Sequence, residues 1–132
     1  MNILFVCMHN RFRSKIAEAI FNKLNKNKKN RARSRGMIKD IDVAQNVIKA
    51  LKEKVIALKS KKSARLTKKD IEWADMIVIV ADNVNKGIFK KSGKKIIVWK
   101  ISDVSQDNIA GIRKRVGIIE KRVAGLIKNL ND

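Results

Sequence analysis

The chain has 132 residues, with 32 Lys plus Arg against 12 Asp plus Glu, which gives a formal net charge of +20. This length and a hydrophobic content of 45% are enough for one folded domain over residues 1–132, and they exclude a disordered chain. No apolar run is long enough to cross a membrane and no signal-peptide pattern opens the chain, so we expect a cytoplasmic protein that binds no membrane.

The first part of the chain predicts two strands and two helices. The continuous apolar run at residues 3–6 is typical of a strand buried on both faces, and residues 14–24 follow with the spacing of an amphipathic helix. Residues 31–36 are expected as a short edge strand, because they alternate weakly and carry three arginines. Residues 41–51 predict a second amphipathic helix.

The second part of the chain continues the alternation of helices and strands. Thr67 is suited to cap a short helix that ends near Ala74, and residues 76–81, the most hydrophobic segment, predict a central strand. The last expected elements are a short helix at 82–89, a strand at 96–99 and a long amphipathic helix at 109–130. This order predicts an α/β fold: one three-layer domain with a four-stranded parallel sheet flanked by helices.

The only cysteine, Cys7, ends the first predicted strand, and Arg13 follows after five intervening residues, where the first helix begins. A loop of this size can wrap a tetrahedral oxyanion with its backbone N–H groups, and the helix start adds a positive dipole end. Arg13 can clamp two phosphate oxygens, and these positive surroundings favour the nucleophilic thiolate. The pattern predicts hydrolysis of a phosphate ester through a phosphocysteine. The alternative is a buried structural cysteine beside solvated arginines.

Residues 2–24 resemble the opening of the low-molecular-weight protein tyrosine phosphatases and of the related thioredoxin-coupled arsenate reductases. The matching residues are the apolar strand, Cys7, Asn10, the Arg13-Ser14 pair and the helix opening Ile16-Ala17-Glu18-Ala19. Weaker similarity covers the rest of the chain. The resemblance implies a phosphatase that needs no cofactor, acts on a phosphorylated protein (phosphotyrosine first) or a small phosphate ester, and releases inorganic phosphate. The phosphate-binding loop then comprises Met8, His9, Asn10, Arg11, Phe12 and Ser14.

Dephosphorylation also needs a general acid, and the expected one is Asp103. In the family this segment carries an Asp-Pro pair on a mobile loop, whereas Val104 follows the aspartate here, so we expect a less rigid loop. Asp107 is a second candidate acid, and Asp103 could instead cap the last helix. The family's tyrosines beside the acid have no counterpart among Ser105, Gln106 and Asp107, which puts a preference for phosphotyrosine in doubt.

Supporting roles are expected for three side chains around the loop. Ser14 is expected to hydrogen-bond the Cys7 sulfur, to cap the first helix, or both. Asn10 lies where a left-handed backbone suits the loop, a conformation that asparagine tolerates well. By the resemblance, Ser34 would hydrogen-bond the Asn10 side chain from the second strand; the alternative is a surface serine.

Two loop residues, Phe12 and Arg11, depart from the family's pattern, and a third, His9, is not expected to be catalytic. Phe12 stands where the family has a second cysteine, so the protective disulfide switch should be absent. Arg11 adds a positive charge that favours substrates with a second anionic group. His9 is the only histidine and more often lines such a pocket than takes part in catalysis. Without a second histidine or a cysteine pair, we expect no metal site.

Two other functions remain open from the sequence. An arsenate reductase would need an external thiol, because the further cysteines of the thioredoxin-coupled relay are missing. A non-catalytic basic module could bind phosphate or nucleic acid. The scattered lysines and few aromatic residues predict at most weak, salt-sensitive and nonspecific association with nucleic acid.

Overall fold

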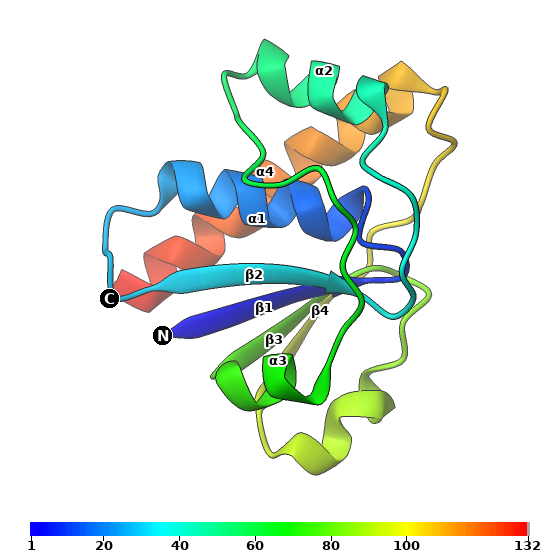
Figure 1. Ribbon diagram of the computed structural model, residues 1–132. Coiled ribbons are helices and arrows are strands. Elements are labelled where there is room, and N and C mark those ends of the chain that lie inside the picture. The colour runs from blue at the N-terminus through cyan, green and yellow to red at the C-terminus, as the bar shows by residue number, and fades with distance from the viewer. Residues whose placement is uncertain (132) are drawn as a thin grey trace.

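Four parallel strands form the centre of the computed structural model, which describes residues 1–131. They are β1 (Asn2–Cys7), β2 (Arg31–Gly36), β3 (Met76–Val80) and β4 (Lys95–Trp99), in the sheet order β2-β1-β3-β4 (Figure 1). The predicted four-stranded parallel sheet is therefore confirmed. The most hydrophobic strand lies inside the sheet, and the arginine-rich strand β2 lies at an edge, where exposed charges discourage pairing with other chains.

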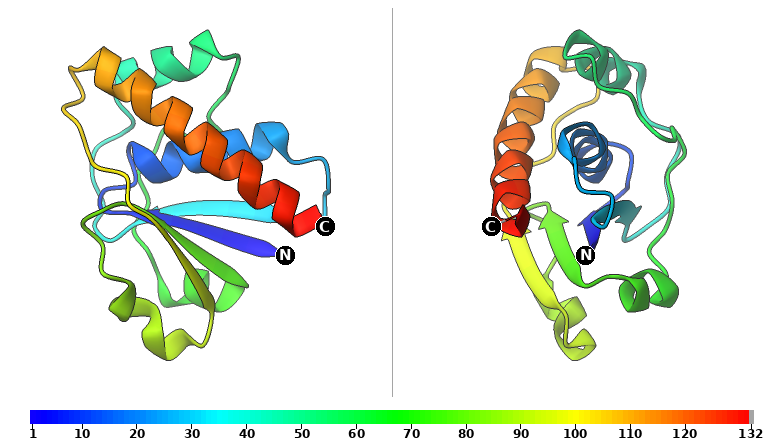
Figure 2. Two further views of the ribbon diagram at one scale, coloured as in Figure 1. Left: turned by 180° about the vertical axis from the view of Figure 1, so that it is seen from behind. Right: turned by 90° about the vertical axis from the view of Figure 1, so that its left-hand side faces the viewer.

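Helices cover both faces of this sheet (Figure 1). One face carries α1 (Arg13–Leu24), α2 (Gln45–Glu53) and α4 (Ile109–Asn131), and α4 runs beside α1 (Figure 2). The other face carries α3 (Lys68–Trp73) and the 3₁₀ helix η1 (Lys86–Ser92). The predicted three-layer α/β fold is confirmed. None of the helices within residues 1–131 has the length and apolarity needed to cross a membrane.

The continuous apolar run in β1 follows from burial on both sides. Ile3 and Phe5 belong to the core beneath α1, α2 and α4, whereas Leu4 and Val6 belong to the core against α3 and η1. All four side chains are fully buried. Because successive strand residues point to opposite faces, a strand between two helical layers needs apolar residues at every position.

The amphipathic segment predicted at 41–51 becomes helical only from Gln45. The backbone N–H of Val43 donates to the carbonyl of Lys61 at 2.8 Å, so the chain before α2 pairs with a distant loop instead of starting a helix. Hydrophobic spacing alone could not show this long-range contact.

On the face of the sheet that carries α3 and η1, side-chain caps determine where both helices begin. Thr67 caps α3 as predicted, in a capping box with Asp70. The short helix predicted at 82–89 is the 3₁₀ helix η1, which starts later because Asn85 Oδ1 accepts from Gly87 N at 2.8 Å. This shift leaves Asp82 and the residue after it in a loop at the carboxyl end of β3.

Gly36 lies where β2 meets the loop that follows β1. A Cβ at this position would lie 2.7 Å from the carbonyl carbon of His9 and 2.8 Å from both Asn10 N and Ile38 O. Because all three atoms are backbone, the clash cannot be relieved by a side-chain rotation. We predict that Gly36→Ala lowers the free energy of unfolding by about 1–3 kcal/mol, measured by urea denaturation.

The matched control is Gly117→Ala in α4, where a Cβ has no neighbour within 4 Å. It should raise stability by roughly 0.5–1 kcal/mol, because alanine is the better helix former. A Gly36→Ala variant as stable as the wild type would contradict this account of the loop's packing.

Candidate active site

Cys7 ends β1 and is 2% exposed. Its Sγ lies 2.9 Å from Ser14 Oγ and accepts from Ser14 N–H at 3.4 Å. The expected contact between serine and sulfur is thus present. The expected N-cap role of Ser14 is wrong, because α1 begins at Arg13 and Phe12 occupies the cap position. The hydroxyl of Ser14 is therefore free to face the sulfur.

Asn10 fixes the shape of the loop between β1 and α1. Its φ is 53°, as expected for a left-handed asparagine, and its side chain is fully buried. Asn10 Nδ2 donates to Ser14 Oγ at 2.8 Å, and Asn10 Oδ1 accepts from Ala64 N at 2.9 Å. Ser63 Oγ adds a hydrogen bond to the carbonyl of His9 at 2.6 Å. A loop more than fifty residues further along the chain thus braces the loop that carries Cys7.

Ser34 does not make the hydrogen bond to Asn10 that the resemblance implied. It is 1% exposed, so it is not a surface serine either, and its Oγ donates to Glu18 Oε1 at 2.7 Å. In the sheet register Ser34 pairs with Phe5, two residues before Cys7. Its side chain therefore reaches α1 rather than the loop, and it joins the sheet to that helix.

Arg13 is 1% exposed and is held by the loops that follow β3 and β4. Nη1 donates to the carbonyl of Ile101 at 2.8 Å and lies 3.4 Å from Asp82 Oδ1, while Nη2 donates to Asn83 Oδ1 at 3.1 Å. Within residues 1–131, Nε donates to no protein acceptor and stays available to an oxyanion. Sequence reasoning missed both Asp82 and Asn83, although their place directly after a central strand marks the sheet's ligand-binding edge.

A cavity of about 230 Å³ opens above the loop. Its lining brings together Cys7, Arg13 and Asp103, the three residues expected to carry catalysis. The other lining residues are His9, Arg11, Phe12, Asp40, Val104, Ser105 and Gln106. Met8 packs instead into the core on the η1 side. In the described part of the chain, no three His, Cys, Asp or Glu residues are grouped closely enough to hold a metal ion.

Two basic side chains at the mouth of this cavity have partners that the sequence did not reveal. His9 Nδ1 lies 3.1 Å from Asp40 Oδ2, within ion-pair range if the ring is protonated, although not aligned for a hydrogen bond. Arg11 donates through Nε and Nη2 to the carbonyl of Asp42 at 3.3 and 3.2 Å. Asp40 thus lies beside the His9 ring, and the carbonyl of Asp42 holds the Arg11 guanidinium.

The segment with Asp103 is held at both ends, although it lacks the family's proline. From α4, Arg115 Nε donates to the carbonyl of Ser102 at 3.0 Å and Nη2 to Ser102 Oγ at 2.8 Å. From α2, Asn46 Nδ2 donates to the carbonyl of Gln106 at 2.9 Å. Side chains from two helices thus hold Ser102 and Gln106, the residues on either side of the stretch 103–105.

Asp103 does not cap the last helix. Asn108 takes that position, with Oδ1 accepting from Gly111 N at 2.9 Å. Asp103 is exposed, and its Oδ1 accepts from Val104 N at 2.9 Å. Asp103 therefore lines the cavity and does not serve as a helix cap. Asp107, the second candidate acid, does not line the cavity.

Lys15, the residue after Ser14, is an unusual buried charge beside the site. It is 5% exposed and donates to the carbonyl of Ser60 at 3.1 Å. Burial lowers the pKa of Lys15 below its ordinary value of 10.5, and the neighbouring carboxylate of Glu18 partly opposes this effect. Between the lowered value and 10.5 the unfolded chain binds more protons, so the contribution of Lys15 to stability increases with pH in that window.

Several solved structures are similar to this chain over nearly its whole length. The arsenate reductase from Archaeoglobus fulgidus DSM 4304 is 27% identical, with a TM-score of 0.76, over 96% of this chain and 98% of that one. A YwlE mutant from Bacillus subtilis is 25% identical, with a TM-score of 0.85, over 100% and 99%. The low molecular weight phosphotyrosine phosphatase VcLMWPTP-2 from Vibrio cholerae O395 shares the fold, with a TM-score of 0.88 at 18% identity over 100% and 97%.

No curated protein sequence matches the chain at a significant level. The family model of the low molecular weight phosphotyrosine protein phosphatases, however, matches residues 2–132. Because that match spans both the loop with Cys7 and the segment with Asp103, the chain belongs to the low molecular weight phosphotyrosine protein phosphatase family.

Proposed function

We propose that this protein is a cytoplasmic cysteine-dependent phosphatase that hydrolyses phosphorylated protein side chains through a phosphocysteine intermediate. The observation that carries the proposal is the position of Cys7 Sγ, 2.9 Å from Ser14 Oγ, in a cavity also lined by Arg13 and Asp103. Family membership independently implies phosphatase activity. A reducing compartment such as the cytoplasm keeps the single thiol reactive.

In the first step the thiolate of Cys7 attacks phosphorus. The new S–P bond forms as the bond from phosphorus to the leaving oxygen breaks, and Asp103 gives its proton to that oxygen. The free Nε–H of Arg13 and the backbone N–H groups of the loop stabilise the charge on the equatorial oxygens. The alcohol or phenol departs, and the phosphoryl group stays on sulfur.

In the second step water attacks the phosphocysteine. The carboxylate of Asp103 takes a proton from the water, the new O–P bond forms, and the S–P bond breaks to release inorganic phosphate. The contact from Ser14 stabilises the departing Cys7 thiolate. Each turnover therefore ends with the thiolate restored and Asp103 protonated again, with no net redox change.

Phosphotyrosine is the substrate that the family implies, and phosphoarginine is a second candidate favoured by the cavity mouth. The carboxylates of Asp40 and Asp103 lie there, and the one aromatic lining residue, Phe12, is 3% exposed. Carboxylates suit a guanidinium leaving group better than an aromatic ring. The YwlE arginine phosphatase from Geobacillus stearothermophilus shares the fold. Peptides carrying either group, assayed side by side, distinguish the two substrates.

The proposal is tested by hydrolysis of an aryl phosphate across pH. We predict that Cys7→Ser abolishes turnover, because the hydroxyl is a far poorer nucleophile at this site. Asp103→Asn should lower kcat by about 10²–10⁴-fold, the usual contribution of general acid–base catalysis. Asp107→Asn is the matched control and should stay near wild type, since Asp107 does not line the cavity.

Two results would oppose these assignments. An equal loss of kcat in the Asp103→Asn and Asp107→Asn variants would contradict the role of Asp103 as the general acid. Binding of vanadate without any wild-type turnover would favour a non-catalytic phosphate-binding module.

Arg115 is expected to act as a positioning residue for the acid. Its hydrogen bonds to Ser102 hold the segment before Asp103, so Arg115→Met should lower kcat about tenfold while the affinity for vanadate and the thermal midpoint stay close to wild type. Arg122→Met, at an exposed position of the same helix, is the matched control. A parallel fall in vanadate affinity and thermal midpoint would instead indicate a general structural role.

A further inference from the structure

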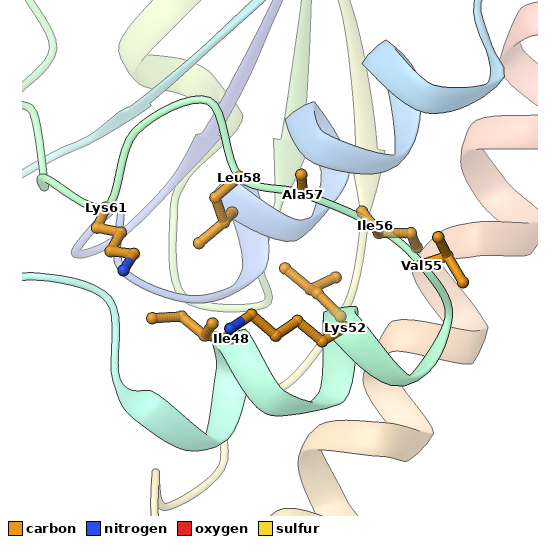
Figure 3. A pocket seen from close by; sticks show the side chains of 8 residues that line it. Ile48, Lys52, Val55, Ile56, Ala57, Leu58 and Lys61 are labelled. Carbon is orange, nitrogen blue, oxygen red and sulfur yellow. The ribbon is translucent and has the colours of Figure 1, made fainter.

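A second cavity, of about 380 Å³, lies between α2 and the segment 55–61 (Figure 3). Its walls are mostly apolar and include Ile48, Leu51, Ile56 and Leu58. The cavity shares no lining residue with the active-site cavity. Its volume falls within the range of about 300–1,000 Å³ that is usual for small-molecule sites.

Val55 at the rim of this cavity has an unusual backbone. Its φ is 59°, in the left-handed region, and its side chain is 83% exposed. The residue occupies the turn that ends α2, where Val55 N donates to Lys52 O and Ile56 N to Leu51 O, both at 2.9 Å. Glycine is the usual residue at this point of such a turn, and a β-branched residue is strained there. A valine at position 55 therefore stabilises neither the turn nor the buried core. Its side chain instead extends the apolar wall of the cavity.

Two lysines line the same cavity. Figure 3 shows the ammonium groups of Lys52 and Lys61 toward one end, with Val55 at the opposite end. Neither ammonium takes part in an ion pair among the residues that the structure describes. The cavity thus has a cationic end and an apolar end, on a chain whose formal charge is +20.

We propose that this cavity binds an alkyl carboxylate, that is, a fatty-acid-like amphiphile. The carboxylate lies between Lys52 and Lys61, and the alkyl tail runs along the apolar walls toward Val55. Charge complementarity selects an anionic head over a cationic one. The chemistry of this site is binding only and is independent of the phosphatase reaction proposed above.

The test is calorimetric titration of the intact chain with decanoate below its micellar concentration. Decyltrimethylammonium, which has an alkyl tail one carbon longer and a head group of opposite charge, is the matched probe. Decanoate should bind saturably at one site, and decyltrimethylammonium about tenfold or more weakly. Absence of saturable decanoate binding, or equal binding of the two probes, would overturn the proposal.

Three variants test whether decanoate binds in this cavity. Val55→Asn removes apolar surface but tolerates the left-handed backbone, so it should weaken decanoate about fivefold without lowering the thermal midpoint. The double variant Lys52→Gln/Lys61→Gln should weaken decanoate by a similar factor. Lys86→Gln/Lys90→Gln in η1, on the other face of the sheet, removes the same charge and should leave the affinity unchanged.

Two outcomes of these variants would contradict the proposed site. One is an equal loss of affinity in the η1 control, which would mean that net charge alone attracts decanoate. The other is a wild-type dimer that Val55→Asn converts to a monomer, which would mean that a second copy of the chain covers this face.

Discussion

The buried side chain of Asn10 is the interaction on which the candidate site most depends. It links the backbone at Ala64 to Ser14, and Ser14 in turn contacts the sulfur of Cys7. The left-handed backbone of Asn10 turns the loop, while both ends of its amide are used inside the protein. A residue at this position must therefore satisfy a conformational and a hydrogen-bonding requirement together, which few side chains can do.

The burial of Arg13 is the second constraint, and it ties the site to the order of the sheet. A guanidinium that is 1% exposed needs acceptors, and the loops after β3 and β4 supply them. Those loops meet Arg13 because β3 lies next to β1 and β4 lies next to β3. The parallel sheet thus brings both loops to the guanidinium, whose Nε donates to no acceptor within residues 1–131.

Much of this arrangement could be predicted from the sequence, because strong local patterns encode it. The fully apolar strand β1, the spacing from Cys7 to Arg13 and the amphipathic helices each depend on neighbouring residues. Two contacts could not be predicted: the hydrogen bond from Ser34 to Glu18 and that from Arg115 to Ser102. Both depend on strand register and on packing between elements distant in the sequence. The late start of α2 has the same cause, a backbone contact with Lys61.

The central claim is that Cys7 forms a covalent bond to phosphorus. The most direct measurement is a rapid denaturing quench of Asp103→Asn during turnover of an aryl phosphate, followed by intact-mass and peptide mass spectrometry. With an aryl phosphate whose phenolate leaves without needing a proton, such as 4-nitrophenyl phosphate, loss of the carboxylate slows attack by water more than it slows formation of the S–P bond. Our account therefore predicts one added phosphoryl group, located on Cys7. Continued turnover with no added mass, or a phosphoryl group on another residue, would contradict it.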